Sequence, residues 1–134
     1  LQSYGNEFGA SVTCGAPSSG PDRVYALTVP PAKIATVTAR AAPGLTFSLS
    51  LIDGLTNCAP ASLRCVAIGS STMTTGAKTL SFPNRSAQPK TFFVLVDSAA
   101  PAIGTYELEA TLADPPSGDW CSNATPLPVG AVQR

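Results

Sequence analysis

The feature that most constrains the fold is an alternation of apolar and polar residues with a period of two. In residues 45–51, leucine or phenylalanine occupies every second position, and threonine or serine occupies the positions between. Such alternation places the apolar side chains on one face of a β-strand and the polar side chains on the other. No stretch of the chain repeats apolar residues at helical spacing for long enough to form a helix. The pattern therefore predicts an all-β protein.

Similar segments recur along the chain, separated by residues that favour turns. The separators include Pro30-Pro31, Ala42-Pro43-Gly44 and the segment 101–104, where proline fixes φ and glycine permits positive φ. The predicted strands cover residues 24–29, 33–39, 45–51, 63–68, 78–82, 90–97 and 104–112. Short strands at this spacing are typical of antiparallel sandwiches and barrels, and we favour the sandwich. We expect a jelly-roll-like β-sandwich of about seven to eight strands.

Individual segments carry further predictions. Residues 90–97 are apolar on both faces, so this strand is expected at the centre of a sheet that is covered on both sides. In the last strand, every second residue from Tyr106 to Leu112 (with Leu108 and Ala110 between them) is expected to face the core, which leaves Glu107 and Glu109 in water. Polar positions on other strands predict a solvated surface or a weak polymer-binding platform; they are Thr36, Thr38, Thr46, Ser48 and Ser50.

The length of 134 residues suits one domain. We expect the sandwich in residues 1–113, a proline-rich linker in 114–119 and a tail in 120–134. The tail either packs back on the sandwich or opens a following repeat. The chain begins with Leu1 and has no apolar run long enough for a membrane span, so a fragment of a longer protein without membrane insertion is expected.

Composition argues against several classes of function. Eight basic residues balance eight acidic ones, which gives no field for nucleic acid. The absence of histidine removes the commonest general base and the usual partner of a nucleophilic serine or cysteine. Glu107 and Glu109 share a strand face that should be wet, so they are not expected to act as an acid and base pair. The sequence predicts no catalytic residue and no enzyme activity.

Four cysteines in a short chain with few charges fit an oxidising compartment, so a secreted or cell-surface location is expected. A bridge between Cys58 and Cys65 would close a short local loop. Cys14 and Cys121 either pair with each other or have partners elsewhere in a longer protein. Four cysteines allow three pairings, and the sequence leaves them open.

Several motifs resemble one known family. The segment 20–29 begins Gly-Pro-Asp and continues through Tyr25 into a strand, and Gly104-Thr105-Tyr106 opens a later one. Together with the loop between Cys58 and Cys65, these segments resemble the bacterial pre-peptidase C-terminal domain. Residues 118–121, followed by 124–127, resemble the start of a further copy. The resemblance implies a jelly-roll-like sandwich that accompanies secreted hydrolases or repeats in surface proteins, and that is not itself the catalyst.

Some members of that family bind calcium through acidic loops. Here Val66-Ala67-Ile68 stands where relatives often carry acidic or amide residues. The remaining candidate ligands for calcium are Asn6, Glu7 and Asp22, which would need backbone carbonyls to complete six to eight oxygens. The alternative is that Asp22 caps a turn and that the other two side chains are solvated. No other cofactor is expected.

Few residues are candidates for binding a partner. Tyr4 and Trp120 are the aromatic residues expected at the surface, although Trp120 could equally close one end of the sandwich. The triplets at 84–86 and 123–125 match the acceptor motif for N-glycosylation, which often occurs by chance.

Three functions are consistent with these observations. The leading hypothesis is a non-catalytic accessory or interaction module of a larger bacterial protein, monomeric and in contact with neighbouring domains of its parent chain. The first alternative is a calcium-dependent domain that binds polysaccharide or a fibrous protein. The second is a C-terminal propeptide that aids secretion of a hydrolase and is removed afterwards.

Overall fold

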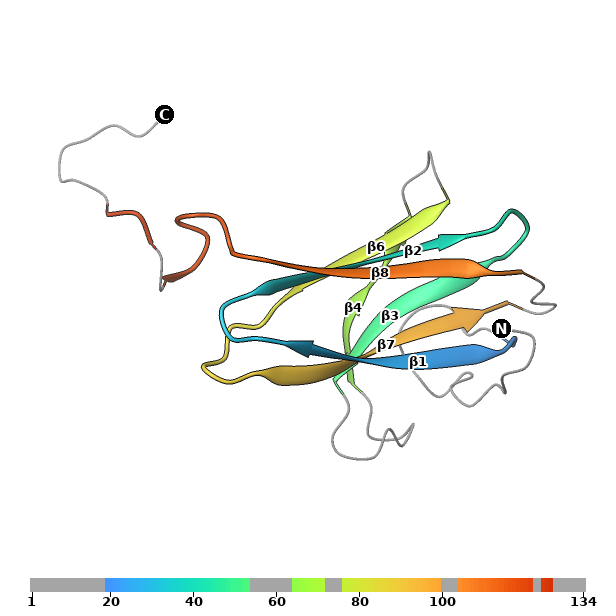
Figure 1. The fold of residues 1–134 in the computed structure, drawn as a ribbon, viewed down its shortest axis with the longest axis horizontal. Coiled ribbons are helices and arrows are strands. Elements are labelled where there is room, and N and C mark those ends of the chain that lie inside the picture. The colour runs from blue at the N-terminus through green and yellow to red at the C-terminus, as the bar shows by residue number, and fades with distance from the viewer. Residues whose placement is uncertain (1–18, 54–63, 72–75, 100–103, 122–123, 127–134) are drawn as a thin grey trace.

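The structure is a computed structural model that describes residues 19–53, 64–71, 76–99, 104–121 and 124–126. These residues form eight strands (Figure 1): β1 (Asp22–Val29), β2 (Ile34–Ala41), β3 (Phe47–Asp53), β4 (Arg64–Ile68), β5 (Ser70–Ser71), β6 (Ala77–Pro83), β7 (Lys90–Ser98) and β8 (Tyr106–Ala113). No α-helix occurs among the residues described. The predicted all-β sandwich is confirmed, and each predicted strand is present within a few residues of its expected bounds.

The strands form two four-stranded sheets, both antiparallel. Sheet A has the order β1-β7-β3-β4, and sheet B has the order β5-β6-β2-β8. Among the described strands, the β3–β4 and β5–β6 connections stay within one sheet, and all the remaining connections cross between the sheets. This repeated crossing brings the first and last strands to the same side of the sandwich (Figure 1), where each is an edge strand.

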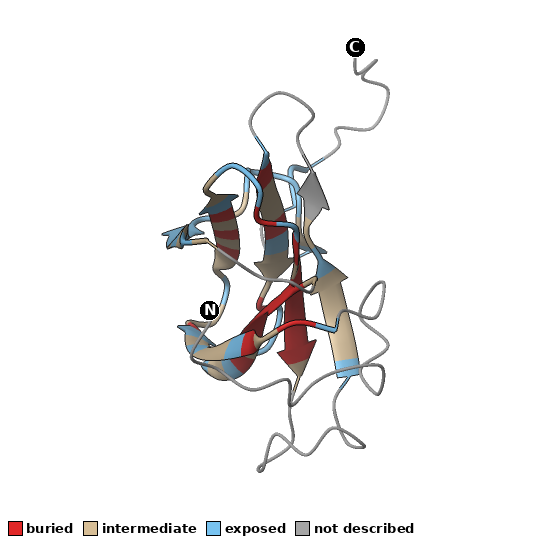
Figure 2. Ribbon diagram, turned by 90° about the vertical axis from the view of Figure 1, so that its right-hand side faces the viewer, coloured by how far each residue is buried: buried red, intermediate tan, exposed pale blue. Residues whose placement is uncertain are grey.

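The main core lies between the sheets and follows the predicted alternation. Buried residues concentrate on the strands in the middle of the molecule (Figure 2). The core cluster consists of Val29, Ala35, Val37, Ala39, Phe47, Leu49, Leu51, Leu80, Phe92, Val94 and Val96. The rings of Phe82 and Phe92, one from each sheet, meet edge to face with their centroids 4.5 Å apart. Burial of this set supplies the main driving force for the fold.

The strand predicted to be central is β7, and the prediction is confirmed. It pairs with β1 on one side and with β3 on the other. Its inner face contributes Phe92, Val94 and Val96, while Leu95 on its outer face is only 3% exposed and packs in a second cluster with Ile52. Sheet A is therefore buried on both faces around β7, whereas the outer face of sheet B is polar.

The second cluster corrects one prediction. Ser50 was expected on a solvated face, but it is 1% exposed. It lies on the outer face of β3, next to the second apolar cluster, and shares in the burial of that face. Ser48, two residues earlier, is half-buried and donates to the backbone carbonyl of Asp97 at 3.4 Å.

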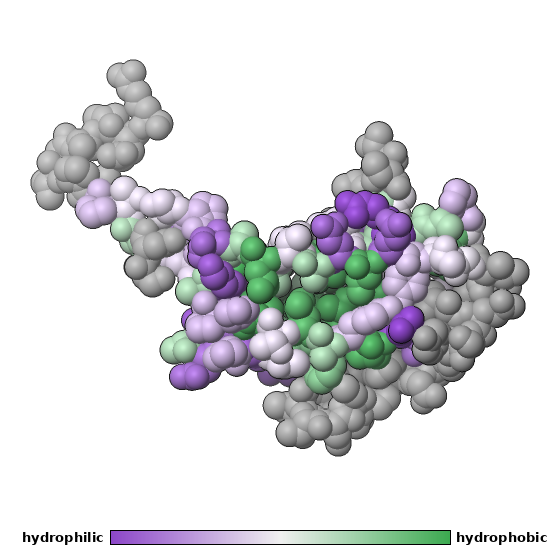
Figure 3. Space-filling view, in the orientation of Figure 1, coloured by the Kyte–Doolittle hydropathy of each residue, from purple (hydrophilic) through white to green (hydrophobic). Residues whose placement is uncertain are grey.

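The exposure of β8 corrects a second prediction, which concerned the side chains expected to face the core. Tyr106 and Leu108 pack against the core as predicted, but Ala110 is exposed and Leu112 is 48% exposed. The expected burial of Ala110 and Leu112 is wrong because β8 is an edge strand, which pairs with β2 alone among the described strands. Apolar side chains are visible in a hollow between β8 and β1 (Figure 3), so the sandwich is open along this side.

At one end of the sandwich, Asn84 joins two chain connections. Its backbone N–H donates to the carbonyl of Lys33 at 2.9 Å, and its backbone carbonyl accepts from the N–H of Ala32 at 3.1 Å. Its side-chain Nδ2 donates to the carbonyls of Val29 and Gln88 at 2.8 and 2.9 Å. The turn after β1 and the turn after β6 are thus held together through one buried residue.

Candidate functional site

The outer face of sheet B carries a regular array of hydroxyl side chains. We call this the hydroxyl face, defined by Thr36 and Thr38 on β2, Thr79 and Ser81 on β6, and Thr111 on β8. The register places Thr36 between Ser81 and Thr111, and Thr38 between Thr79 and Glu109. Hydroxyl oxygens pair across strands at 3.0 Å in Thr36–Ser81 and at 3.2 Å in Thr38–Thr79. The face is therefore ordered by its own hydrogen bonds.

Charged residues lie beside the hydroxyl face at one end. Arg40 Nη1 lies 3.3 Å from Glu109 Oε2, and both side chains are more than half exposed. Such a pair adds little stability, on the order of 0.2–1 kcal/mol. Glu107, the register partner of Arg40, is exposed as predicted. Hydroxyls, one cation and two carboxylates together offer donors and acceptors over a face built from three adjacent strands.

The predicted calcium ligands are described only in part. Asp22 begins β1 and is 5% exposed, whereas Asn6 and Glu7 lie outside the described residues. Directly opposite Asp22 in the β1–β7 register is Asp97, also 5% exposed. Within the described ranges, no three His, Cys, Asp or Glu side chains gather closely enough to hold a metal ion.

Sequence reasoning missed Asp97 as a neighbour of Asp22. The two residues are far apart along the chain, and their pairing depends on the register between β1 and β7. Side chains directly opposite each other in an antiparallel pair lie about 4.5–5.5 Å apart at Cβ. Two carboxylates are thus brought to one buried place on sheet A.

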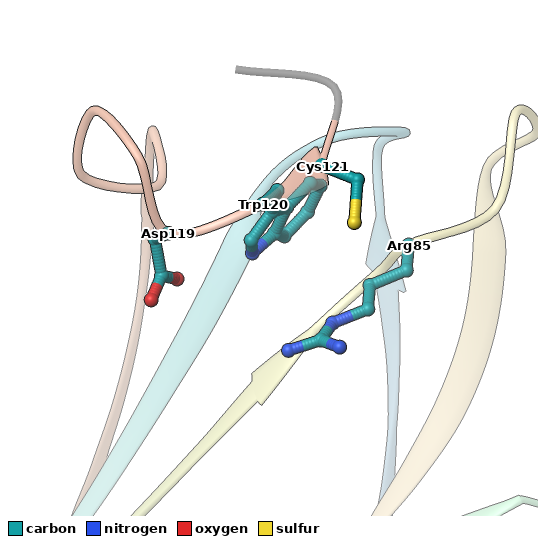
Figure 4. A pocket seen from close by; sticks show the side chains of 4 residues that line it. All are labelled: Arg85, Asp119, Trp120 and Cys121. Carbon is teal, nitrogen blue, oxygen red and sulfur yellow. The ribbon is translucent and has the colours of Figure 1, made fainter. Parts of the chain in front are cut away.

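A cavity at the end of the sandwich includes the predicted binding residue Trp120. It has a volume of about 320 Å³ and is lined by Arg85, Asp119, Trp120 and Cys121 (Figure 4). The guanidinium carbon of Arg85 lies 5.9 Å from the centre of the Trp120 ring. Sequence reasoning did not pair Arg85 with Trp120, because they follow different strands. The other predicted aromatic, Tyr4, is outside the described residues.

Two of the cysteines are described. Cys121 is an exposed free thiol, whereas Cys65 on β4 is half-buried and is not a free thiol. Their expected partners, Cys14 and Cys58, lie outside the described residues. The pairing of Cys58 with Cys65 therefore stays a prediction, whereas the free thiol of Cys121 does not support its pairing with Cys14.

Other polar side chains that could serve a function are instead engaged in contacts within the fold. Tyr25 and Tyr106 face inward as predicted, and their hydroxyl oxygens are 2.6 Å apart across the two sheets. Asp53 Oδ2 accepts from Lys90 Nζ at 2.7 Å. Asn84, in a glycosylation triplet, is 2% exposed with its side chain engaged in hydrogen bonds, so the folded protein does not present it to a modifying enzyme.

Comparison of the chain with models of protein families, with curated proteins and with solved structures finds no match. The likeness to the pre-peptidase C-terminal domain consequently rests on the short motifs in the sequence. In the described part of the chain, no helix has the length and hydrophobicity to cross a membrane.

Proposed function

We propose that this chain is a non-catalytic accessory module of a larger extracytoplasmic bacterial protein, and that it acts by contact through the hydroxyl face. The family resemblance supports the accessory role. The hydroxyl face supports the mode of action, since its side chains are aligned in register over three adjacent strands. Polar groups held in fixed positions lose little side-chain entropy when they bind a partner.

A repeating polymer is the partner that this face suits best. The hydroxyl rows repeat at every second residue along β2, so they offer the same groups at regular intervals. Threonine and serine hydroxyls both donate and accept hydrogen bonds, as do the hydroxyls of a polysaccharide. We therefore propose an extended polysaccharide as the main partner, contacted weakly and over several strands.

The test is sedimentation of the purified protein with insoluble cellulose, chitin or peptidoglycan. We expect the wild-type protein to co-sediment with at least one polymer and to release no soluble sugar from it. The Ser81→Arg variant places a long cationic side chain on the hydroxyl face and should lower the apparent affinity about tenfold, which corresponds to about 1.4 kcal/mol.

The matched control uses the other sheet. Thr28 and Thr91 form an exposed hydroxyl pair at 2.9 Å on β1 and β7, similar to Thr36–Ser81. The Thr91→Arg variant should bind as the wild type does. Failure of the wild type to bind any of the polymers, equal binding by Ser81→Arg, or release of soluble sugar would each contradict the proposal.

The disulfide between Cys58 and Cys65 belongs to the same proposal, because it accompanies an extracytoplasmic location. Its support is that Cys65 is not a free thiol. We expect both cysteines to resist alkylation in the native protein until a reductant is added. Alkylation of both in the unreduced native protein would contradict the bridge and weaken the assignment of compartment.

A second candidate function is calcium-dependent binding, and the pairing of Asp22 with Asp97 favours it. Carboxylate oxygens are preferred ligands of calcium, and the register of β1 with β7 brings two of these groups to one place. Asn6 and Glu7 remain proposed as further ligands. Calcium bound to the native state alone would raise the unfolding temperature in a concentration-dependent way.

The calcium candidate is tested by thermal unfolding with added calcium and with a chelator. The candidate requires a rise with calcium that is absent in the Asp97→Asn variant. An unfolding temperature that is the same with calcium and with chelator would eliminate it and would leave the accessory role untouched.

A further inference from the structure

We infer that the cavity around Trp120 is a binding site for one neutral pyranose ring of a glycan. This inference deepens the proposed function, since it rests on a polysaccharide partner and assigns the class of ring that is recognised. The site lies outside the hydroxyl face, at the end of the sandwich where the chain leaves β8 (Figure 4).

The segment after β8 is anchored to the sandwich. Asp114 Oδ1 lies 2.6 Å from Lys33 Nζ, which holds the start of the segment near the turn between β1 and β2. The backbone N–H of Asp119 then donates to the carbonyl of Pro116 at 3.1 Å, which closes a turn. Three of the residues that line the cavity, Asp119, Trp120 and Cys121, follow from this connection, while Arg85 comes from the turn after β6.

A glycine allows this turn to form. Gly118 has a φ of +82°, a conformation that other residues rarely adopt. A Cβ atom there would stand 3.1 Å from Thr125 Oγ1, so the chain beyond the turn packs closely against Gly118. The turn positions Asp119 and Trp120 side by side at the end of the sandwich.

The side chains that line the cavity combine a cation, a carboxylate and an aromatic ring. Figure 4 shows the Trp120 indole between the carboxylate of Asp119 and the Arg85 side chain, with the guanidinium group turned toward the indole. Arg85 offers five N–H donors, Asp119 offers carboxylate acceptors, and the indole offers an apolar face. Among the described residues, Arg85 has no ion-pair partner, so its donors are not committed to a carboxylate.

These groups select the class of ligand. Asp119 disfavours a net anion and Arg85 disfavours a net cation, so a ligand without net charge fits both groups. A neutral ligand that presents an apolar C–H face to an indole and hydroxyls to both donors and acceptors is a pyranose ring. The volume of about 320 Å³ lies at the small end of ligand sites, which span about 300–1,000 Å³, and therefore suits a single ring.

The experiment uses the fact that Trp120 is the sole tryptophan of the chain, so tryptophan emission reports on this site alone. The wild-type protein is titrated with cellopentaose, mannopentaose and N-acetylchitotetraose up to about 10 mM, because affinities for one ring are weak. We expect a saturable change in emission with at least one of these probes. The Arg85→Ala and Asp119→Asn variants, both at exposed positions, should each weaken that response about tenfold.

Thr91→Arg is the control, since Thr91 is exposed on sheet A and lies outside this cavity; it should respond as the wild type does. An emission spectrum unchanged by all three probes would overturn the inference, and so would a response that survives unaltered in both cavity variants. Sedimentation of the wild type with a polymer, combined with an unresponsive Trp120, would retain the proposed function and reject this site. A Trp120 response to a soluble probe, combined with no sedimentation with any polymer, would reject the hydroxyl face and retain the cavity as a binding site.

Discussion

At the scale of single residues, Asn84 shows how a structural role can resemble a functional motif. The triplet 84–86 matches a glycosylation signal, but Asn84 Oδ1 accepts from the backbone N–H and the hydroxyl of Ser86 at 3.0 and 2.7 Å. The serine that completes the motif is therefore the partner of the asparagine within the turn. Sequence alone could not distinguish these roles, because both require the same residues at the same spacing.

Replacement of Asn84 should be costly. The Asn84→Ala variant leaves the carbonyls of Val29 and Gln88 without their donor, and we expect a loss of about 3 kcal/mol in the free energy of unfolding, measured in urea. Ser86→Ala removes only exposed or local bonds and should lose about 1 kcal/mol. Equal stability of the Asn84→Ala variant and the wild type would contradict the structural role of this side chain.

At the scale of strands, the sequence predicted which segments are extended but did not predict all of their surroundings. The apolar character of both faces of 90–97 was sufficient to predict a central strand, and β7 is central. The alternation in 104–112 predicted which face of β8 points inward. It did not predict the exposure of that face, because whether a strand lies at the edge of its sheet depends on pairing between distant strands. The two-residue strand β5 was not predicted. Strand β5 follows Gly69, and a Cβ atom at Gly69 would lie 3.0 Å from the Cβ atom of Leu49, so the backbone passes close to β3 at this point.

The contrast between β7 and β8 predicts different costs of truncation. Phe92 on β7 is fully buried and should lose about 3–5 kcal/mol of stability as Phe92→Ala. Leu112 on β8 is 48% exposed, and Leu112→Ala should lose less than about 1 kcal/mol. Chemical denaturation of both variants measures the difference, and a similar loss for the two would contradict the assignment of β8 to an open edge.

The hydrogen bond between Tyr25 and Tyr106 connects β1 to β8 across the open side. A double-mutant cycle with Tyr25→Phe and Tyr106→Phe should give a coupling of about 1 kcal/mol in the free energy of unfolding, because each single variant already removes the shared bond. Strictly additive effects would show that the bond does not hold the two edge strands together.

At the scale of the whole molecule, the sandwich is predictable from the sequence, while the candidate sites are largely not. Alternation and turn residues are local signals, and they suffice for a fold that buries one face of each strand. The hydroxyl face was anticipated through Thr36 and Thr38, but its partners on β6 and β8 depend on register. The cavity at Trp120 requires the turn after β6 and the segment after β8 to meet in space.

The proposed bridge between Cys58 and Cys65 should stabilise the whole molecule by limiting the unfolded chain. The chain-entropy model gives about 2.5 kcal/mol for so short a loop. The reduced protein should therefore unfold at a lower urea concentration than the oxidised protein. Identical midpoints before and after reduction would contradict the bridge, provided that mass spectrometry shows alkylation of both cysteines in the reduced sample.

We propose that this protein acts through contacts of its surface, while its interior holds the two sheets together. We would test this by following the chemical shift of each backbone amide during titration with cellopentaose, mannopentaose and N-acetylchitotetraose. We expect changes confined to β2, β6 and β8 on the hydroxyl face and to residues around Arg85 and Trp120. Changes concentrated on the outer face of sheet A, or no change at any amide, would contradict it.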